Sequence, residues 1–265
     1  MTPMTVLIRT ELFKIRTARL SYGLLGTGAG LTVLFSLLEA ARSGPGKAVP
    51  PLNTVSGLTS VVAGGTWTLL MAAVLGAIVS SGEFRHSTAT LTYLATPHRS
   101  RVLAAKTTAA ALAGTVFGLV GYLIAAGVGL GFVAARGYHV PVGDATLIRY
   151  GLGHIVATAL LAAIGAALGS LVRSQLAVVI GVFAWTIVIE SLLGALVNQV
   201  QPYLPYTAAT TLGGTQLGGA SFGPAHGAST TAAPLPFAAA TALLVAVAAA
   251  VSLLAAWTTV RRDVA

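Results

Sequence analysis

The sequence predicts an all-α polytopic membrane protein, with six transmembrane helices in a single transmembrane domain over residues 1–265. Hydrophobic residues make up 55% of the chain, charged residues only 8%, and the mean hydropathy is +0.87. A soluble domain carries about 25% charged residues, so a water-soluble enzyme and a disordered chain are excluded. The few charges separate apolar runs of roughly 20 residues, the length that crosses a bilayer. Without cysteine, the chain has no disulfide, Cys-ligated zinc, iron–sulfur or thiol chemistry.

The first element is an amphipathic helix over residues 4–19. Met4, Ile8, Leu12 and Ile15 share its apolar face, which Glu11 interrupts. Two readings stay open: a basic helix on the membrane surface, or an elbow helix that also contacts a cytoplasmic partner. The following apolar run is longer than the core of a signal peptide, so we expect it to be an uncleaved span.

The six expected spans lie between charged residues or loops. They are Leu20–Ala40, Thr59–Ser81, Thr107–Ala135, Leu147–Leu171, Gln175–Val197 and Pro236–Thr258.

The distribution of basic residues predicts that both termini are cytoplasmic. With that orientation, the inner segments hold eleven basic residues: Arg9, Lys14, Arg16, Arg19, Arg85, Arg99, Arg101, Lys106, Arg173, Arg261 and Arg262. The outer segments and span ends hold four: Arg42, Lys47, Arg136 and Arg149. This bias accounts for the basic pI, and no nucleic-acid partner is implied.

The largest inner loop, residues 82–106, predicts a short helix through Ala95 that Ser87 or Thr88 caps. Pro97 ends that helix, and a new helix begins at His98 and continues into the third span. Two readings stay open: an ordinary capped loop helix, or a rigid element that couples a partner's motion to the spans.

Several segments of the chain resemble one family in sequence order. The stretches Glu83-Phe-Arg-His-Ser-Thr and Leu94-Ala-Thr-Pro-His-Arg-Ser-Arg-Val-Leu-Ala-Ala-Lys106 resemble the first cytoplasmic loop of ABC-2 type transporter permeases, especially actinobacterial drug and antibiotic exporters. Residues 11–19 are similar to the family's connecting helix. Residues 189–193 and 203–206 are similar to its fifth-span exit and outer re-entrant region. Ser87 and Ser191 depart from the glycine and proline frequent there, which affects the expected shape of the coupling turn.

The resemblance implies a type V exporter-like fold, with an amphipathic connecting helix, a cytoplasmic coupling helix and an outer re-entrant segment. It implies a bacterial plasma-membrane location, a second permease copy as a homodimer or heterodimer, and two copies of a separate P-loop ATPase. The chain lacks GxxxxGK[ST], so ATP and Mg²⁺ belong to the ATPase, and no cofactor is expected here. The residues implied to contact the ATPase are Glu83, Phe84, Arg85, His86, Thr88, Tyr93 and Leu94.

The outer segment from residue 198 to residue 235 carries no formal charge. We expect insertion at the outer boundary for residues 198–212 and mobile coil for residues 213–235, because glycine pairs interrupt the second part.

Glu190 is the acidic residue that lies well inside a predicted span. A charge in lipid is costly, so it should face protein or water. His154 lies at matching depth on the fourth span and Arg149 nearer the surface, which predicts a Glu190–His154 contact with Arg149 as a second candidate. The contact either fixes packing or forms a polar element of an outer gate.

Four large side chains on the second and fifth spans are candidates to line an apolar substrate route: Trp67, Met71, Phe183 and Trp185. In the resembled family these spans flank the dimer interface; core or lipid-facing roles are the alternative. Gly26/Gly30, Gly114/Gly118, Gly127/Gly131 and Gly165/Gly169 form GxxxG pairs, which allow close helix packing.

The favoured function is an exporter subunit for drugs, antibiotics, peptides or lipids, without catalysis of its own. HExxH is absent, and the five histidines lack metal-ligand spacing. Two alternatives stay open: an ion- or proton-coupled secondary carrier that titrates Glu190 and His154, and a non-transporting anchor or immunity subunit.

Overall fold

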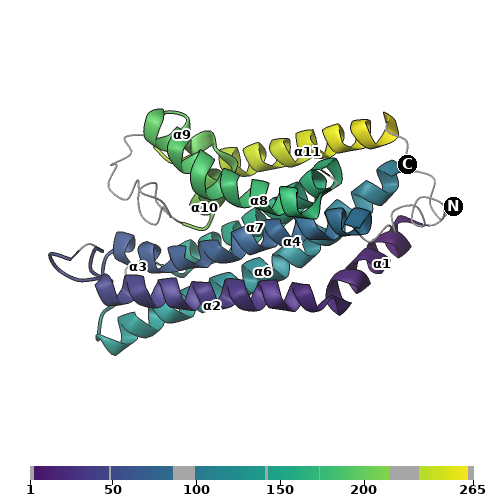
Figure 1. Ribbon diagram of the computed structural model, residues 1–265. Coiled ribbons are helices and arrows are strands. Elements are labelled where there is room, and N and C mark those ends of the chain that lie inside the picture. Colours follow the sequence, from purple (N-terminus) through teal and green to yellow (C-terminus); the bar gives the residue numbers. More distant parts are fainter. Residues whose placement is uncertain are drawn as a thin grey trace.

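The computed structural model describes residues 3–47, 49–85, 99–140, 143–172, 174–214 and 233–261. Within this part of the chain every regular element is helical, and no strand occurs. The helices form a bundle of long rods (Figure 1). The predicted all-α class is confirmed.

The bundle is built from five long helices and several short ones. The long helices are α2 (Arg19–Arg42), α4 (Thr66–Arg85), α6 (Arg99–Ala135), α7 (Asp144–Val172) and α11 (Phe237–Arg261). The short α-helices are α1 (Met4–Thr17), α3 (Val55–Val62), α8 (Gln175–Phe183), α9 (Glu190–Leu196) and α10 (Pro205–Leu212). Two 3₁₀ turns, η1 (Ala63–Gly65) and η3 (Gln201–Tyr203), and one π-helical turn, η2 (Ala184–Ile189), complete the described elements.

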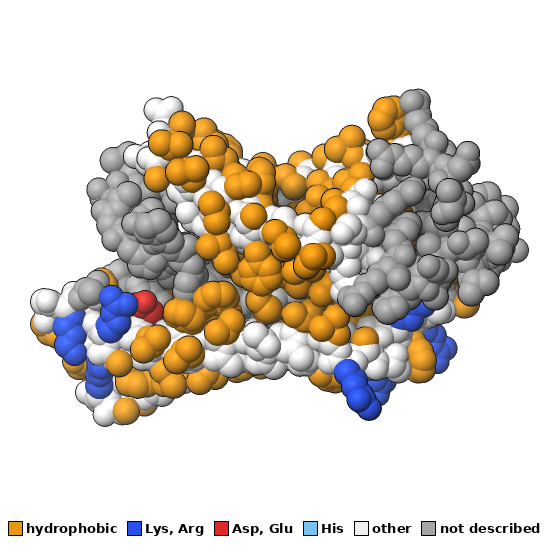
Figure 2. All heavy atoms as spheres, in the orientation of Figure 1, with side chains coloured by type: hydrophobic (Ala, Val, Ile, Leu, Met, Phe, Trp, Pro, Cys, Tyr) orange, Lys and Arg blue, Asp and Glu red, His pale blue; other side chains and the backbone are white. Residues whose placement is uncertain are grey.

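In the described part of the chain, six segments are long and apolar enough to cross a membrane, as predicted. They are Arg19–Arg42, Val55–Gly82, Ser100–Ala135, Ala145–Val172, Gln175–Leu196 and Phe237–Thr258. On the face drawn in Figure 2, hydrophobic side chains cover the middle of the bundle, and Lys and Arg lie toward its ends. The start of α1 and the end of α11 lie at the same end of the bundle (Figure 1), the arrangement of a multi-pass membrane protein with an even number of spans.

The N-terminal helix is separate from the first span. α1 ends at Thr17, Ala18 has extended backbone with φ −74° and ψ 118°, and α2 begins at Arg19. The expected single helix over residues 4–19 is therefore two residues shorter. α1 packs against α6 and buries Glu11 and Ile15.

The second span changes its helical geometry along its length. Thr54 caps α3 by accepting a hydrogen bond from the Gly57 N–H at 3.2 Å. The chain then tightens into η1 before α4 begins. At this turn α2 lies close, because Ser36 Oγ donates to the Val61 carbonyl at 2.9 Å and a Cβ on Gly64 would overlap that hydroxyl. The second span is also the most buried of the six, so it forms the centre of the bundle.

α4 and α7 approach closely through glycine. A Cβ added to Gly165 would lie 2.0 Å from the Ala73 carbonyl oxygen, and one on Gly169 would lie 2.3 Å from that of Ala77. Neither position can carry a larger side chain unless the helices separate.

The four GxxxG pairs divide into two classes. Gly165/Gly169 packs on α4, and Gly114/Gly118 of α6 packs on α7 with added Cβ atoms 2.8 Å from its nearest atoms. Gly26/Gly30 and Gly127/Gly131 would meet nothing within 4 Å. The packing role predicted for these pairs is confirmed within the chain for two of them.

At the end opposite α1, α2 is fastened to α6. The Arg136 guanidinium donates to the carbonyl oxygens of Ala40 at 3.0 Å and Ser43 at 3.2 Å, and to Ser43 Oγ at 2.9 Å. Arg136 thereby satisfies carbonyl groups at the C-terminus of α2 that have no partner within the helix.

The two predicted loop elements are described only in part. α6 begins at Arg99, which confirms that a helix restarts before Lys106 and continues into the third span. The expected short helix capped by Ser87 or Thr88 lies outside the described residues.

In the outer segment, α10 packs against α7 and α11 and buries Ala208, Ala209 and Leu212. Of the expected mobile coil over residues 213–235, residues 215–232 also lie outside the described part.

Candidate functional site

A buried carboxylate, Glu190, lies where the π-helical turn η2 meets α9. The residue is 4% exposed, and its carboxylate accepts four hydrogen bonds. Oε1 accepts from Trp185 Nε1 at 2.8 Å and from the Tyr206 backbone N–H at 2.9 Å. Oε2 accepts from the Thr207 backbone N–H at 3.0 Å and from Thr207 Oγ1 at 3.1 Å.

Glu190 caps α10 from a different helix. Leu204 precedes this helix and has no side-chain capping group, and Pro205 at the first position has no N–H to donate. The next two amides, of Tyr206 and Thr207, are among those that a helix leaves unpaired, and both donate to Glu190. A negative charge is also favoured at a helix N-terminus. The arrangement therefore fixes the start of α10 to the fifth span.

The π-helical turn brings Trp185 and Glu190 together. In a π turn the backbone hydrogen bond joins residues i and i+5, the separation between these two side chains. Trp185 is 43% exposed, so one edge of its ring contacts the carboxylate while the rest faces outward. π turns are frequent at functional sites, and this one marks the point where the fifth span meets α10.

Tyr206 joins α10 to the second span as well. Its phenol O–H donates to the Thr66 carbonyl at 2.9 Å, and Thr66 is the first residue of α4. Burial raises the pKa of the Tyr206 phenol, and nearby Glu190 adds to the rise. The phenol therefore stays a hydrogen-bond donor at neutral pH. Through Glu190 and Tyr206, α10 is held to the fifth and second spans at the same time.

The predicted Glu190–His154 contact is wrong. His154 of α7 is 3% exposed, and its Nε2 lies 3.2 Å from Thr68 Oγ1 on α4. The Thr68 hydroxyl donates its single proton to the Gly65 carbonyl at 2.7 Å, so both contacts are satisfied when His154 Nε2–H is the donor. His154 thus binds the η1–α4 junction, and its partner is not a carboxylate.

The second predicted partner of Glu190 also lies elsewhere. Arg149 places its guanidinium carbon 5.5 Å from the ring centroid of Phe237, at the start of α11. This is a cation–π contact. The rotation of each span about its axis directs these side chains to different neighbours.

The four predicted route residues lie at different contacts. Trp67 packs near Phe35 of α2 with ring centroids 5.0 Å apart. Met71 is buried and contacts α2 at Gly28, where an added Cβ would lie 3.2 Å from Met71 Cγ. Phe183 packs against the hydrophobic core that contains Met71, whereas Trp185 belongs to the Glu190 cluster. A role for these four in lining a substrate route stays a prediction.

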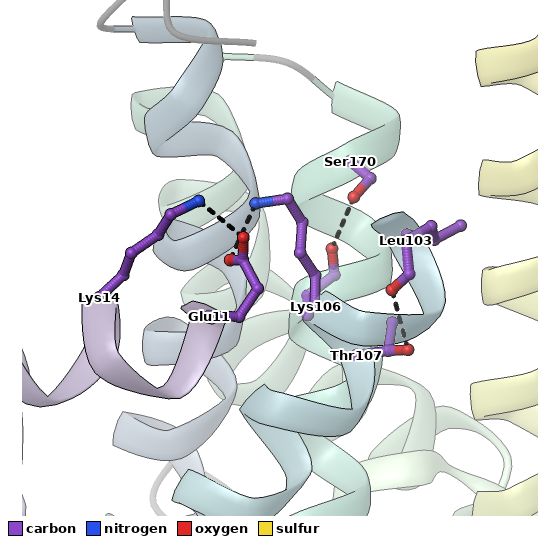
Figure 3. Close-up of polar contacts among 7 residues, drawn as sticks. Glu11, Lys14, Leu103, Lys106, Thr107 and Ser170 are labelled. Carbon is purple, nitrogen blue, oxygen red and sulfur yellow. Dashed lines mark hydrogen bonds and ion pairs between the residues drawn. The ribbon is translucent and has the colours of Figure 1, made fainter. Parts of the chain in front are cut away.

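At the other end of the bundle, a buried ion pair joins α1 to α6. Lys106 Nζ lies 3.1 Å from Glu11 Oε2, and Lys14 Nζ lies 2.6 Å from Oε1 (Figure 3). The side chains of Lys106 and Glu11 are 5% and 7% exposed, against 46% for Lys14. Sequence reasoning noted Glu11 on an apolar helix face but assigned it no partner. A carboxylate on the apolar face of a helix indicates that a cation from another element is buried beside it.

The residues predicted to contact an ATPase lie where α4 ends or beyond it. Glu83, Phe84 and Arg85 form the last turn of α4. His86, Thr88, Tyr93 and Leu94 lie outside the described residues. The described part of the loop thus consists of the helix ends that flank it, the end of α4 and the start of α6.

The described residues contain no group of three or more His, Cys, Asp or Glu side chains that could hold a metal ion. In comparisons with known proteins, no protein-family model and no curated protein matches the chain.

Proposed function

We propose that the chain is the membrane-spanning permease subunit of an ATP-driven exporter of the ABC-2 type. Its substrates are amphipathic or apolar compounds, such as a drug, an antibiotic, a peptide or a lipid, carried across the bacterial plasma membrane. Both termini are cytoplasmic. Two copies of a separate ATPase bind ATP and Mg²⁺, and a second permease copy, identical or related, completes the transporter. The chain itself hydrolyses nothing.

The buried contact between Glu11 and Lys106 is the observation that carries this proposal. The segment that resembles the coupling loop connects these helices: α4 ends within its first part, at Arg85, and α6 begins within its second part, at Arg99. An ATPase that moves this segment therefore acts on α4 and α6 together. Because Glu11 is ion-paired to α6 in a buried site, α1 moves with α6, as a connecting helix would.

The contacts of α10 support an outer gate at the opposite end. The acceptor of the Tyr206 hydroxyl is Thr66, the first residue of α4. A displacement of α4 at its cytoplasmic end is carried along the helix to this carbonyl. In the proposed cycle, movement of α4 relative to the fifth span strains the attachment of α10 to one or both spans and opens the outer end.

The secondary-carrier alternative gains no support from the site. A proton relay through Glu190 and His154 needs the two groups to face each other or a shared water path, and each binds a different set of partners on different elements. No observation favours the anchor or immunity alternative over transport.

A pull-down from native membranes in mild detergent tests the proposal. The tagged chain is compared with the triple variant Glu83→Ala, Tyr93→Ala, Leu94→Ala and with the control Arg42→Gln, Lys47→Gln, which alters exposed cations at the opposite end. We expect a stoichiometric P-loop ATPase with the wild type and the control, and its loss with the triple variant. Absence of any ATPase after cross-linking would overturn the family assignment.

A further inference from the structure

The face of α1 that points away from α6 has an apolar stripe. Val6, Thr10, Phe13 and Thr17 recur at helical spacing on this side, opposite the buried Glu11 and Ile15. Val6 is 47% exposed and Phe13 is 66% exposed. Side chains of this kind on the outside of a helix are typical of helices that lie in a membrane interface.

Both threonines of the stripe turn their hydroxyl groups inward. Thr10 Oγ1 donates to the Val6 carbonyl and Thr17 Oγ1 to the Phe13 carbonyl, each at 2.9 Å. The hydroxyl donors are therefore satisfied within the helix and need no water. The stripe presents methyl and aromatic groups outward, which suits contact with acyl chains.

Cations flank the stripe on both sides. Arg9 and Arg16 lie two turns apart on one side of it, and Lys14 lies on the other. Neither arginine forms an ion pair with any carboxylate in the described part of the chain. Glu11 is the sole acid of α1, and it is buried on the opposite face with Lys106 and Lys14. Figure 2 shows Lys and Arg side chains at this end of the molecule.

We propose that the outward face of α1 is a binding surface for anionic phospholipids of the adjoining leaflet. Val6 and Phe13 lie among the acyl chains, and the guanidinium groups of Arg9 and Arg16 bind headgroup phosphates, for which their fork of donors is suited. A surface with exposed cations and no exposed acid favours lipids with net negative charge over zwitterionic ones. A single residue, Ala18, separates α1 from the first span, so the helix lies at the membrane boundary, where a soluble acidic protein has poorer access.

The inference does not depend on the transport proposal, because the residues proposed to contact the ATPase lie on a different segment, residues 83–94. Anionic lipid binding would stand if no ATPase were captured.

Energy transfer from α1 to labelled lipids tests the inference. The chain has no cysteine, so Thr5→Cys, beside the stripe, gives a single site for a donor dye on the full-length protein. The labelled protein is placed in phosphatidylcholine nanodiscs that hold a small fraction of acceptor-labelled phosphatidylglycerol or, in parallel, acceptor-labelled phosphatidylcholine. We expect greater transfer to phosphatidylglycerol, which reports its enrichment at α1.

Charge variants identify the groups responsible. The variant Arg9→Gln, Arg16→Gln replaces both arginines. Each replacement should lower the phosphatidylglycerol enrichment about fivefold. Arg9→Lys, Arg16→Lys should retain most of it, and the opposite-end control Arg42→Gln, Lys47→Gln should leave it unchanged. Equal transfer to both lipids, or enrichment that survives Arg9→Gln, Arg16→Gln, overturns the inference. Equal loss in the opposite-end control also overturns it, because net charge alone would then explain the enrichment. If Arg9→Gln, Arg16→Gln abolish ATPase capture but not lipid enrichment, the face binds a protein and the lipid inference is wrong.

Discussion

Glu11 and Lys106 are 95 residues apart in the sequence, yet their side chains meet at 3.1 Å in a buried site. An exposed ion pair contributes little to stability. Removal of one partner from a buried pair leaves a charge without compensation and is strongly destabilising. The pair therefore fixes the position of α1 on α6, and it does so beside the loop that resembles the family's coupling loop.

Lys106→Met should destabilise the folded protein by about 3–5 kcal/mol, because Glu11 stays buried and loses its buried cation, while Lys14 is half exposed. Lys14→Met should cost about 1 kcal/mol or less, since the Lys14 side chain is 46% exposed. Unfolding in detergent, followed by circular dichroism, measures both.

The double variant Glu11→Leu, Lys106→Met is the control for this pair. Both charges are removed and apolar side chains of similar size replace them, so stability should recover most of the loss. A double variant as unstable as Lys106→Met would mean that the charge pairing is not the source of the effect.

Glu190→Gln should release the start of α10. Glutamine keeps the shape of the side chain but has one acceptor oxygen, so at least one of the amides of Tyr206 and Thr207 loses its partner. Each such buried hydrogen bond contributes about 1 kcal/mol. In the chain with Thr211→Cys as its single cysteine, Glu190→Gln should speed maleimide labelling of α10.

Trp185→Phe is the matched control for Glu190→Gln. It removes one donor to the carboxylate, while both α10 amides keep Glu190 as their acceptor, so labelling should change little.

If Glu190→Gln leaves efflux unchanged at equal expression, the residue fixes packing only and the gate role is wrong.

Tyr206→Phe should cost about 1 kcal/mol by removing the hydrogen bond to the Thr66 carbonyl. The pKa of the Tyr206 phenol is raised above its ordinary value of 10.0 in the folded state. The stabilisation from this group is therefore complete below pH 10 and is lost as the pH rises through the higher folded-state pKa. The difference in unfolding free energy between wild type and Tyr206→Phe should be constant from about pH 6 to about pH 9. A difference that shrinks within this window would contradict the assignment.

The spans were predictable from the sequence because scarce charges separate apolar runs of the right length. The breaks within them were not. Gly64 and Gly65 gave no signal strong enough to place the η1 turn, since glycine is common throughout this chain. The π-helical turn at Ala184–Ile189 adds a local change of helical phase that hydropathy does not record.

The partners of the buried polar residues were only partly predictable. Hydropathy predicts that Glu190 and His154 lie inside spans, but the rotation of each span depends on tertiary packing. Glu190 is directed to α10, and His154 to Thr68. For Glu11, the mismatch between a carboxylate and an apolar helix face was visible, yet the choice of Lys106 required the α1–α6 packing.

Glycine substitutions separate the packed face of the bundle from the open one. Gly165→Ala should destabilise the protein severely, because the added Cβ would lie 2.0 Å from the Ala73 carbonyl oxygen, on a helix backbone that cannot move alone. Gly127→Ala adds the same methyl group where nothing lies within 4 Å, and alanine is the better helix former. We therefore expect unchanged or slightly higher stability for Gly127→Ala. The apparent midpoint of thermal unfolding in detergent compares the two variants directly. Similar losses for both would mean that α6 is packed at Gly127 against a partner, such as a second copy of the chain, that survives in detergent.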